Sequence, residues 1–179
     1  MYPVYQTVYD EEMSSLTRAT VCFLRKGNTV LLGRKQKKIG KGFWNGYGGL
    51  EEKEDATIED TAVRETKEEI GVLVEKSALH KIGVIAYHNQ SEDKKLSAIE
   101  VHFYTAHTWE ESPSGSDEMD SLTWFQVDAL PFDEMMPSDK LWLEQALTHG
   151  ECIYGTVRHD KNKEVAEAIF DTVPVTKSM

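Results

Sequence analysis

Three acidic side chains, Glu65, Glu68 and Glu69, lie within five residues of one another. Arg64 has the spacing to pair with Glu68, but neither Glu65 nor Glu69 has a cation at helical neighbour spacing. Like charges so placed repel by roughly a few tenths of a kcal/mol in water, and by more beside apolar surface. Hard divalent cations such as Mg²⁺ or Mn²⁺ bind carboxylate oxygens and are usually completed by substrate phosphates. The spacing therefore favours a Mg²⁺ site, with a solvated acidic face as the alternative.

The segment that carries these acids favours a helix. No Pro or Gly interrupts Thr57 to Ile70, acids occupy the first turn, and Gly71 stands where a helix C-terminus favours glycine. We therefore expect a helix of about four turns over this range. At about 100° per residue, the three glutamates share one flank of the helix, with Glu68 at its edge.

The same stretch resembles the Nudix box, GX5EX7REUXEEXGU, in which U is an apolar residue. The matching residues are Gly48, Gly49, Arg64, Glu65, Glu68, Glu69, Gly71 and Val72. The resemblance implies a metal-dependent hydrolase in which the Gly48 carbonyl and the three glutamates hold the metal and Arg64 belongs to the catalytic site. The glycines form neither a P-loop nor a dinucleotide fingerprint, because GxxxxGK[ST] and GxGxxG are both missing.

The stretch departs from the Nudix box at two places. Thr66 occupies a position that is usually aliphatic, and the loop over residues 49–64 is one residue longer than the consensus. Counting back along this loop puts Ala56 at the position of the first box glutamate, with Glu54 and Asp55 just before it. The helix acids are therefore a firmer basis for a metal site than the loop acid.

Segments outside the box are similar to the MutT-type branch of the Nudix family, which hydrolyses oxidised purine nucleoside triphosphates. They are residues 30–33, 44–49, 116–119, 124–125, 130–132, 137 and 139. The similarity implies an α/β/α sandwich with a central mixed β-sheet. It also implies Mg²⁺-assisted attack of water on the triphosphate, releasing nucleoside monophosphate and pyrophosphate. In this chemistry either Glu69 or Glu118 accepts the proton.

The resemblance also implies which residues contact the substrate. Those expected around the purine base are Thr20, Asn45, Tyr47, Met136 and Asp139. An amide such as Asn45 can both donate to and accept from the purine edge, and Tyr47 is placed for stacking. Ser138 replaces a second aspartate of the family and Met136 replaces an aromatic ring, so the nucleotide, oxidised or ordinary, stays open. Within the basic stretch 34–41, we choose Lys35 to contact phosphate oxygens. For Thr20, Asn45 and Tyr47, packing or turn formation is the structural alternative.

Two other functions stay open on the sequence alone. The same scaffold could act on another nucleoside diphosphate derivative, such as a dinucleotide or a nucleotide sugar. A protein of a different class would keep the fold as a non-catalytic nucleotide-binding regulator. The intact glutamates at positions 65, 68 and 69 argue against the regulator.

The composition favours one globular domain over residues 1–179, with residues 1–16 an irregular lead-in or an extra strand. A net charge of −11 disfavours binding to duplex nucleic acid or an anionic membrane. A small nucleotide is compatible with this charge, because a bound metal inverts the local field. Cys22 and Cys152 do not make a disulfide framework, which favours the reducing cytoplasm. The sequence offers no targeting signal and no apolar run that would span a bilayer.

Hydrophobic periodicity outlines the remaining elements. Strands are expected at residues 19–24, 29–32, 82–87, 99–109, 122–127 and 153–157, with the first two joined in a hairpin. A polar loop is expected over 88–95. Ser138 is expected to cap a helix that runs to His149 and stops at Gly150. Residues 164–173 fit a helix or a strand, and we favour a closing hairpin with the strand before them.

Overall fold

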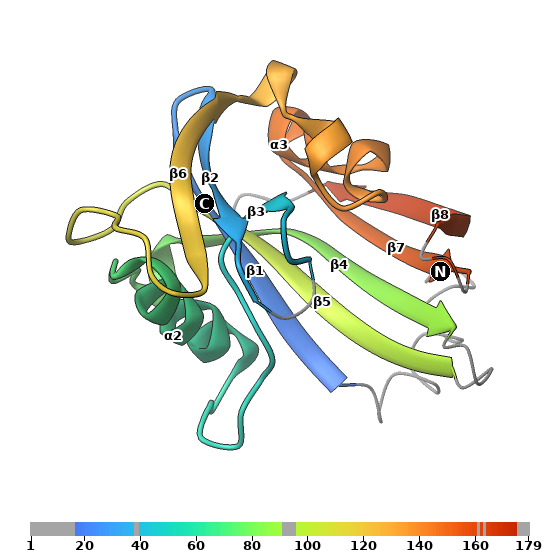
Figure 1. Ribbon diagram of the computed structural model, residues 1–179, viewed down its shortest axis with the longest axis horizontal. Helices are drawn as coiled ribbons and strands as arrows, with labels where there is room; N and C mark the ends of the chain where they lie inside the picture. Colours follow the sequence, from blue (N-terminus) through green and yellow to red (C-terminus); the bar gives the residue numbers. More distant parts are fainter. Residues whose placement is uncertain (1–16, 38–39, 91–95, 161, 163, 175–179) are drawn as a thin grey trace.

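The computed structural model describes residues 17–37, 40–90, 96–160, 162 and 164–174. These residues form an eight-stranded mixed sheet in the order β3-β2-β1-β5-β4-β7-β8, and β6 also pairs with β2 (Figure 1). The strands are β1 Thr17–Lys26, β2 Thr29–Lys35, β3 Trp44–Asn45, β4 Leu79–Gln90, β5 Leu96–Ala106, β6 Met119–Gln126, β7 Glu151–His159 and β8 Val165–Pro174. Residues 1–16 lie outside the described part of the chain.

Helices cover both faces of the sheet. Helix α2, Ile58–Ile70, lies against one face, and α3, Leu143–His149, lies against the other (Figure 1). Alternate residues of each strand enter opposite cores: Phe23 on β1 packs with the α3 side and Leu24 packs with the α2 side. The expected α/β/α sandwich with a central mixed sheet is therefore confirmed. Within the described ranges, no helix combines the length and the apolar character that a membrane crossing requires.

The ends of α2 are set by local sequence, as expected. The Thr57 hydroxyl accepts from the Asp60 N–H, and the Asp60 carboxylate accepts from the Thr57 N–H, which completes a capping box. Gly71 ends the helix in the left-handed conformation with φ 75°. Both ends agree with the predicted bounds, so the register of the three glutamates along the helix is fixed locally.

Most of the predicted strands are present, with shifted ends. The hairpins β1–β2 and β7–β8 are both antiparallel pairs, which confirms the closing hairpin. Strand β4 continues to Gln90, so part of the predicted polar loop over 88–95 is strand; residues 91–95 lie outside the described ranges. Strand β5 ends at Ala106 rather than at residue 109. The extension of β4 places Asn89 in register beside β7, which proves important for the site.

The predicted helix from Ser138 to His149 is wrong in its first half. A 3₁₀ turn, η4 Asp139–Leu141, comes first, and α3 begins only after Trp142, whose φ of −146° interrupts the helix. The reason is tertiary, because the Trp142 ring is buried 4.6 Å from the Phe103 ring and against Gly83, where a Cβ would meet it at 3.2 Å. Ser138 makes no capping hydrogen bond; the break leaves it facing a cavity instead.

Candidate active site

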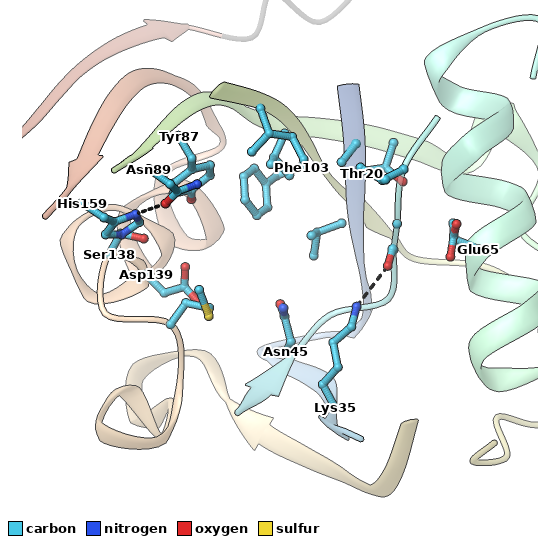
Figure 2. A pocket seen from close by; sticks show the side chains of 18 of the residues that line it. Thr20, Lys35, Asn45, Glu65, Tyr87, Asn89, Phe103, Ser138, Asp139 and His159 are labelled. Atoms are coloured by element: carbon cyan, nitrogen blue, oxygen red, sulfur yellow. Dashed lines mark hydrogen bonds between the residues drawn. The ribbon is translucent and has the colours of Figure 1, made fainter. Parts of the chain in front are cut away.

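A cavity of about 460 Å³ lies on the α3 face of the sheet. Its floor is formed by side chains of β1 and β5, including Val21, Val101 and Phe103. Figure 2 shows Lys35 and Glu65 at one end of this cavity and His159 at the other. The two ends differ in chemistry, and we call them the charged end and the polar end.

At the charged end, a buried lysine joins the backbone to a glutamate of α2. Lys35 Nζ lies 3.2 Å from the Gly48 carbonyl oxygen and 3.4 Å from Glu69 Oε1. The Gly48 N–H donates to Glu69 Oε2 at 2.9 Å. Burial raises the pKa of Glu69, whereas the Lys35 charge and the Gly48 N–H act in the opposite direction. As expected, no cation at helical neighbour spacing pairs with this acid; its positive partner is Lys35, which comes from the distant strand β2.

Arg64 neutralises the second glutamate, Glu65, which lines the cavity. Arg64 Nη1 lies 2.8 Å from Glu65 Oε1, although adjacent helical residues were not expected to meet. Gly49 allows the carboxylate to approach the backbone, since a Cβ on Gly49 would come within 2.4 Å of Glu65 Oε1. Glu65 is thereby held at the mouth of the charged end between an arginine and a glycine.

Asp55 is the loop acid that the sequence left unassigned. Its carboxylate accepts from Arg64 at 2.9 Å and from the Thr61 hydroxyl at 2.9 Å. The Arg64 guanidinium holds the pKa of Asp55 well below its usual range. Arg64 therefore binds two carboxylates at once. Asp55 fixes the guanidinium, and the guanidinium in turn positions Glu65.

Glu68 lies at the edge of the helix flank that carries the other two glutamates. Its side chain is 60% exposed and lies 3.4 Å from Arg64, as the spacing predicted for that pair. Among the described residues, no group of three His, Cys, Asp or Glu side chains is gathered as a metal site. Glu65 and Glu68 both contact Arg64 Nη1, so the three carboxylates lie along one flank with Glu68 at its exposed edge, as expected; the role of Glu68 as a metal ligand stays a prediction.

The remaining donors do fit a hard cation. Lys35 Nζ already bridges the Gly48 carbonyl and the Glu69 carboxylate, so a positive charge is accommodated between two of the predicted metal ligands. Glu65 adds a carboxylate on the same helix face, one turn away. Carboxylate and carbonyl oxygens are the ligands that Mg²⁺ and Mn²⁺ prefer.

Glu118 comes from the loop before β6. The register of β6 with β2 sets Met119 opposite Lys35, and the Glu118 carbonyl accepts from the Gln36 N–H at 2.9 Å. The half-buried Glu118 thus lies next to the strand end that carries Lys35. It is not among the residues that line the cavity, and its role in proton transfer stays a prediction.

Four of the five residues expected around the base line the cavity: Thr20, Asn45, Met136 and Asp139. Asn45 Oδ1 accepts from the Gly46 N–H at 2.8 Å, so its amide nitrogen is the group it offers to a ligand. Burial raises the pKa of Asp139 to about 7, partly opposed by a hydrogen bond to the backbone of Met136. A carboxyl group in this range can donate as well as accept at neutral pH.

Tyr47 is the exception, and its predicted role in the base pocket is wrong. The ring is fully buried in the core on the α2 side of the sheet. Its hydroxyl donates to the Leu31 carbonyl at 3.1 Å. Strict alternation from the cavity residue Asn45 would place Tyr47 on the cavity face. Strand β3 ends at Asn45, and the irregular backbone after it sends the Tyr47 side chain to the other face.

Sequence reasoning missed three residues of the polar end: Tyr87, Asn89 and His159. His159 Nδ1 lies 2.9 Å from Asn89 Oδ1, and the imidazole is parallel to the Tyr87 ring with centroids 6.0 Å apart (Figure 2). The only available signal was strand pairing, because β4 and β7 run parallel with Asn89 opposite His159. Because the sequence predicts a polar loop over 88–95, it gives no reason to pair Asn89 with β7.

Comparisons with known proteins identify the family to which this fold belongs. A family model described as the NUDIX domain matches residues 15–146. An oxidized purine nucleoside triphosphate hydrolase of Mus musculus is 37% identical over 130 residues, which cover 73% of this chain and 79% of that protein. The protein of the same name from Danio rerio is 39% identical over 123 residues, 69% of this chain and 74% of that protein.

A solved structure agrees as well. The crystal structure of a MutT protein from Bacillus halodurans matches with a TM-score of 0.72 at 24% identity, covering 87% of this chain and 98% of that chain. The family match spans well over half of the chain and includes the whole charged end. The chain belongs to the NUDIX family.

Proposed function

We propose that this protein is a Mg²⁺-dependent pyrophosphohydrolase that cleaves a purine nucleoside triphosphate, oxidised or ordinary, to nucleoside monophosphate and pyrophosphate. The carrying observation is a single cavity with two chemically different ends. At one end Lys35 suits a polyphosphate, with Glu65 in the lining and Glu69 behind it as carboxylates for a metal. Toward the other end, Asn45 and Asp139 suit the edge of a base. A cavity of about 460 Å³ suits a small-molecule ligand.

The charged end supplies positive charge and fixed oxygen donors. Lys35 is buried, so its ammonium attracts a phosphate oxygen more strongly than a solvated lysine would. Glu65, Glu69 and the Gly48 carbonyl would hold the metal, and Glu68 would reach it only by leaving Arg64. A bound Mg²⁺ or Mn²⁺ offsets charge on phosphoryl oxygens and makes water more acidic.

A glutamate then takes the proton from the attacking water. Glu69 and Glu118 are the two candidates, and they differ in position, because Glu69 is buried behind Lys35 and Glu118 lies on the loop before β6. Glu118→Gln and Glu69→Gln separate them through the pH profile of kcat. The variant that loses the acidic limb of that profile has lost the proton acceptor.

Base recognition rests on the middle of the cavity. Asn45 offers an amide N–H, Asp139 offers a carboxyl that is protonated in part at neutral pH, and Met136 offers an adaptable apolar contact. The relatives named as oxidized purine nucleoside triphosphate hydrolases support a purine here. The two buried thiols, Cys22 and Cys152, are free, which supports a reducing compartment such as the cytoplasm.

Product analysis by chromatography tests the proposal. The purified chain is incubated with ordinary and oxidised purine nucleoside triphosphates, a dinucleotide and a nucleotide sugar, each with Mg²⁺ and with a chelator. We expect nucleoside monophosphate and pyrophosphate from a purine triphosphate, and only with the metal. Preference for the dinucleotide or the nucleotide sugar would mean that the substrate is a nucleoside diphosphate derivative and not a triphosphate. Tight binding without turnover would indicate a regulator.

A further inference from the structure

The polar end of the cavity holds buried polar atoms that have no partner within the protein. Among the described residues, five buried side-chain atoms lack a hydrogen bond, and three of them belong to cavity residues: Thr20 Oγ1, Ser138 Oγ and His159 Nε2. A buried polar group without a partner costs about 1–3 kcal/mol. Such groups gathered around one cavity indicate that a ligand supplies the missing partners.

The hydrogen bond to Asn89 decides which kind of partner His159 needs. Asn89 Oδ1 can only accept, so His159 Nδ1, at 2.9 Å, must carry the proton. In the neutral imidazole the other nitrogen, Nε2, is then an acceptor. Burial lowers the pKa of His159, opposed only in part by Asp160, which favours this neutral form.

The contact with Asn89 fixes the orientation of the imidazole, because a half turn of the ring would move Nδ1 away from Asn89 Oδ1. Asn89 and His159 are opposite one another in the parallel pairing of β4 with β7, and the Tyr87 ring lies parallel to the imidazole at an interplanar angle of 4°. His159 is 8% exposed, so solvent does not compete for Nε2. The polar end therefore presents a buried acceptor that an N–H or O–H of a ligand can satisfy.

We propose that His159, oriented by Asn89, is a specificity-determining residue that accepts a hydrogen bond from an exocyclic amino group of the purine base. This inference rests on the proposed nucleotide site and assigns the distal edge of the base to the residue pair Asn89–His159. A base that carries a carbonyl or hydrogen at that edge leaves Nε2 buried and unpaired. Sites that satisfy a buried polar group in this way discriminate strongly against analogues that lack the partner.

Calorimetric binding to matched nucleotides tests the inference without requiring turnover. The ligands are α,β-methylene analogues of guanosine and inosine triphosphate, which differ by a 2-amino group, and of adenosine and purine riboside triphosphate, which differ by a 6-amino group. For one of these pairs we expect the amino form to bind the natural chain about tenfold more tightly or better. His159→Phe, which keeps a ring beside Tyr87, should bring that ratio to about twofold or less.

Two controls separate the acceptor from general packing. His159→Gln restores a side-chain acceptor and should recover a large part of the ratio. His80→Phe makes the same substitution on the exposed part of β4, outside the cavity, and should leave the ratio unchanged. If His159→Phe still prefers the amino forms, or if the natural chain shows no such preference, the role of His159 is overturned and the proposed function stands. Failure of every analogue to bind overturns the proposed function as well.

Discussion

The charged end and the polar end of the cavity differ in how their groups are satisfied. At the charged end every principal group has a partner: Lys35 contacts Glu69, and Arg64 contacts Glu65. At the polar end, Ser138 and His159 keep buried atoms without a hydrogen bond. A ligand at the charged end must therefore replace existing contacts, whereas a ligand at the polar end completes missing ones.

This difference assigns the two ends different tasks. Preformed ion pairs keep the charged end rigid and oriented, which is what a reaction at phosphorus needs. Unpaired polar atoms penalise any ligand that fails to match them, which is what selection among similar bases needs. We therefore expect changes at the charged end to lower kcat and changes at the polar end to alter the choice of base.

The largest effect is expected from Glu69→Gln. The substitution removes a predicted metal ligand and leaves Lys35 without its buried anion, so kcat should fall by about 10²–10⁴-fold. Pyrophosphate release at saturating Mg²⁺ measures this, and circular dichroism checks that the fold is intact. Glu54→Gln on the exposed loop is the matched control and should keep full activity. Full activity of Glu69→Gln would remove the metal site from this end.

A smaller loss is expected from Arg64→Lys. Lysine cannot reproduce the fork that binds Asp55 and Glu65 together, so Glu65 loses its orientation while the net charge is unchanged. We expect kcat to fall by about 10–100-fold. Arg158→Lys, at an exposed ion pair with Glu167, makes the same substitution and should have no effect. An Arg64→Lys variant as active as the natural chain would show that the clamp is not needed.

Asp139 should make the free energy of unfolding depend on pH, while the chain stays folded over the range tested. Its pKa in the folded chain is raised from 3.8 to about 7, so the folded state holds a proton that the unfolded state releases. The free energy of unfolding should therefore fall as the pH rises between these values and level off above them. The total change is roughly 4 kcal/mol at most.

Urea titrations at about pH 5 and about pH 8 measure this slope for the natural chain and for Asp139→Asn. The variant has no titrating group at this position, so its stability should change less between the two conditions. Asp133→Asn, on an exposed nearby turn, is the control and should keep the natural slope. An unchanged slope in Asp139→Asn would mean that the carboxyl is ionised in the folded chain at neutral pH.

The smallest effect is expected from Tyr47→Phe. Losing the hydroxyl leaves the Leu31 carbonyl without one donor and should cost about 1 kcal/mol of stability. KM for the nucleotide should not change, because Tyr47 lies on the opposite side of the sheet from the cavity. Thermal unfolding and steady-state kinetics measure the two quantities. A raised KM at unchanged stability would indicate that Tyr47 contacts the base after all.

The same comparison explains what the sequence predicted well. The charged end depends on α2, whose limits at Thr57 and Gly71 are set by neighbouring residues, so its glutamates could be placed from spacing alone. What spacing missed were partners distant in sequence: Lys35 lies 34 residues before Glu69 and reaches it through the sheet. Glu68 lies at the exposed edge of the flank, as its spacing predicted.

The polar end was largely beyond sequence reasoning. Asn89 and His159 are separated by 70 residues and meet only because β4 and β7 pair in parallel. Ser138 faces the cavity because the burial of Trp142 breaks a helix that local propensity favours. Neither event leaves a periodic signal in the sequence, since each depends on packing between distant elements.

A crystal structure with Mg²⁺ and an α,β-methylene purine nucleoside triphosphate tests the central claim most directly. We expect the phosphates between Lys35 and Glu65, a cation bound by Glu69 and the Gly48 carbonyl, and the base beside Asn45 and Asp139. A nucleotide bound outside this cavity, or a cation bound away from both glutamates, would contradict the assignment of the two ends.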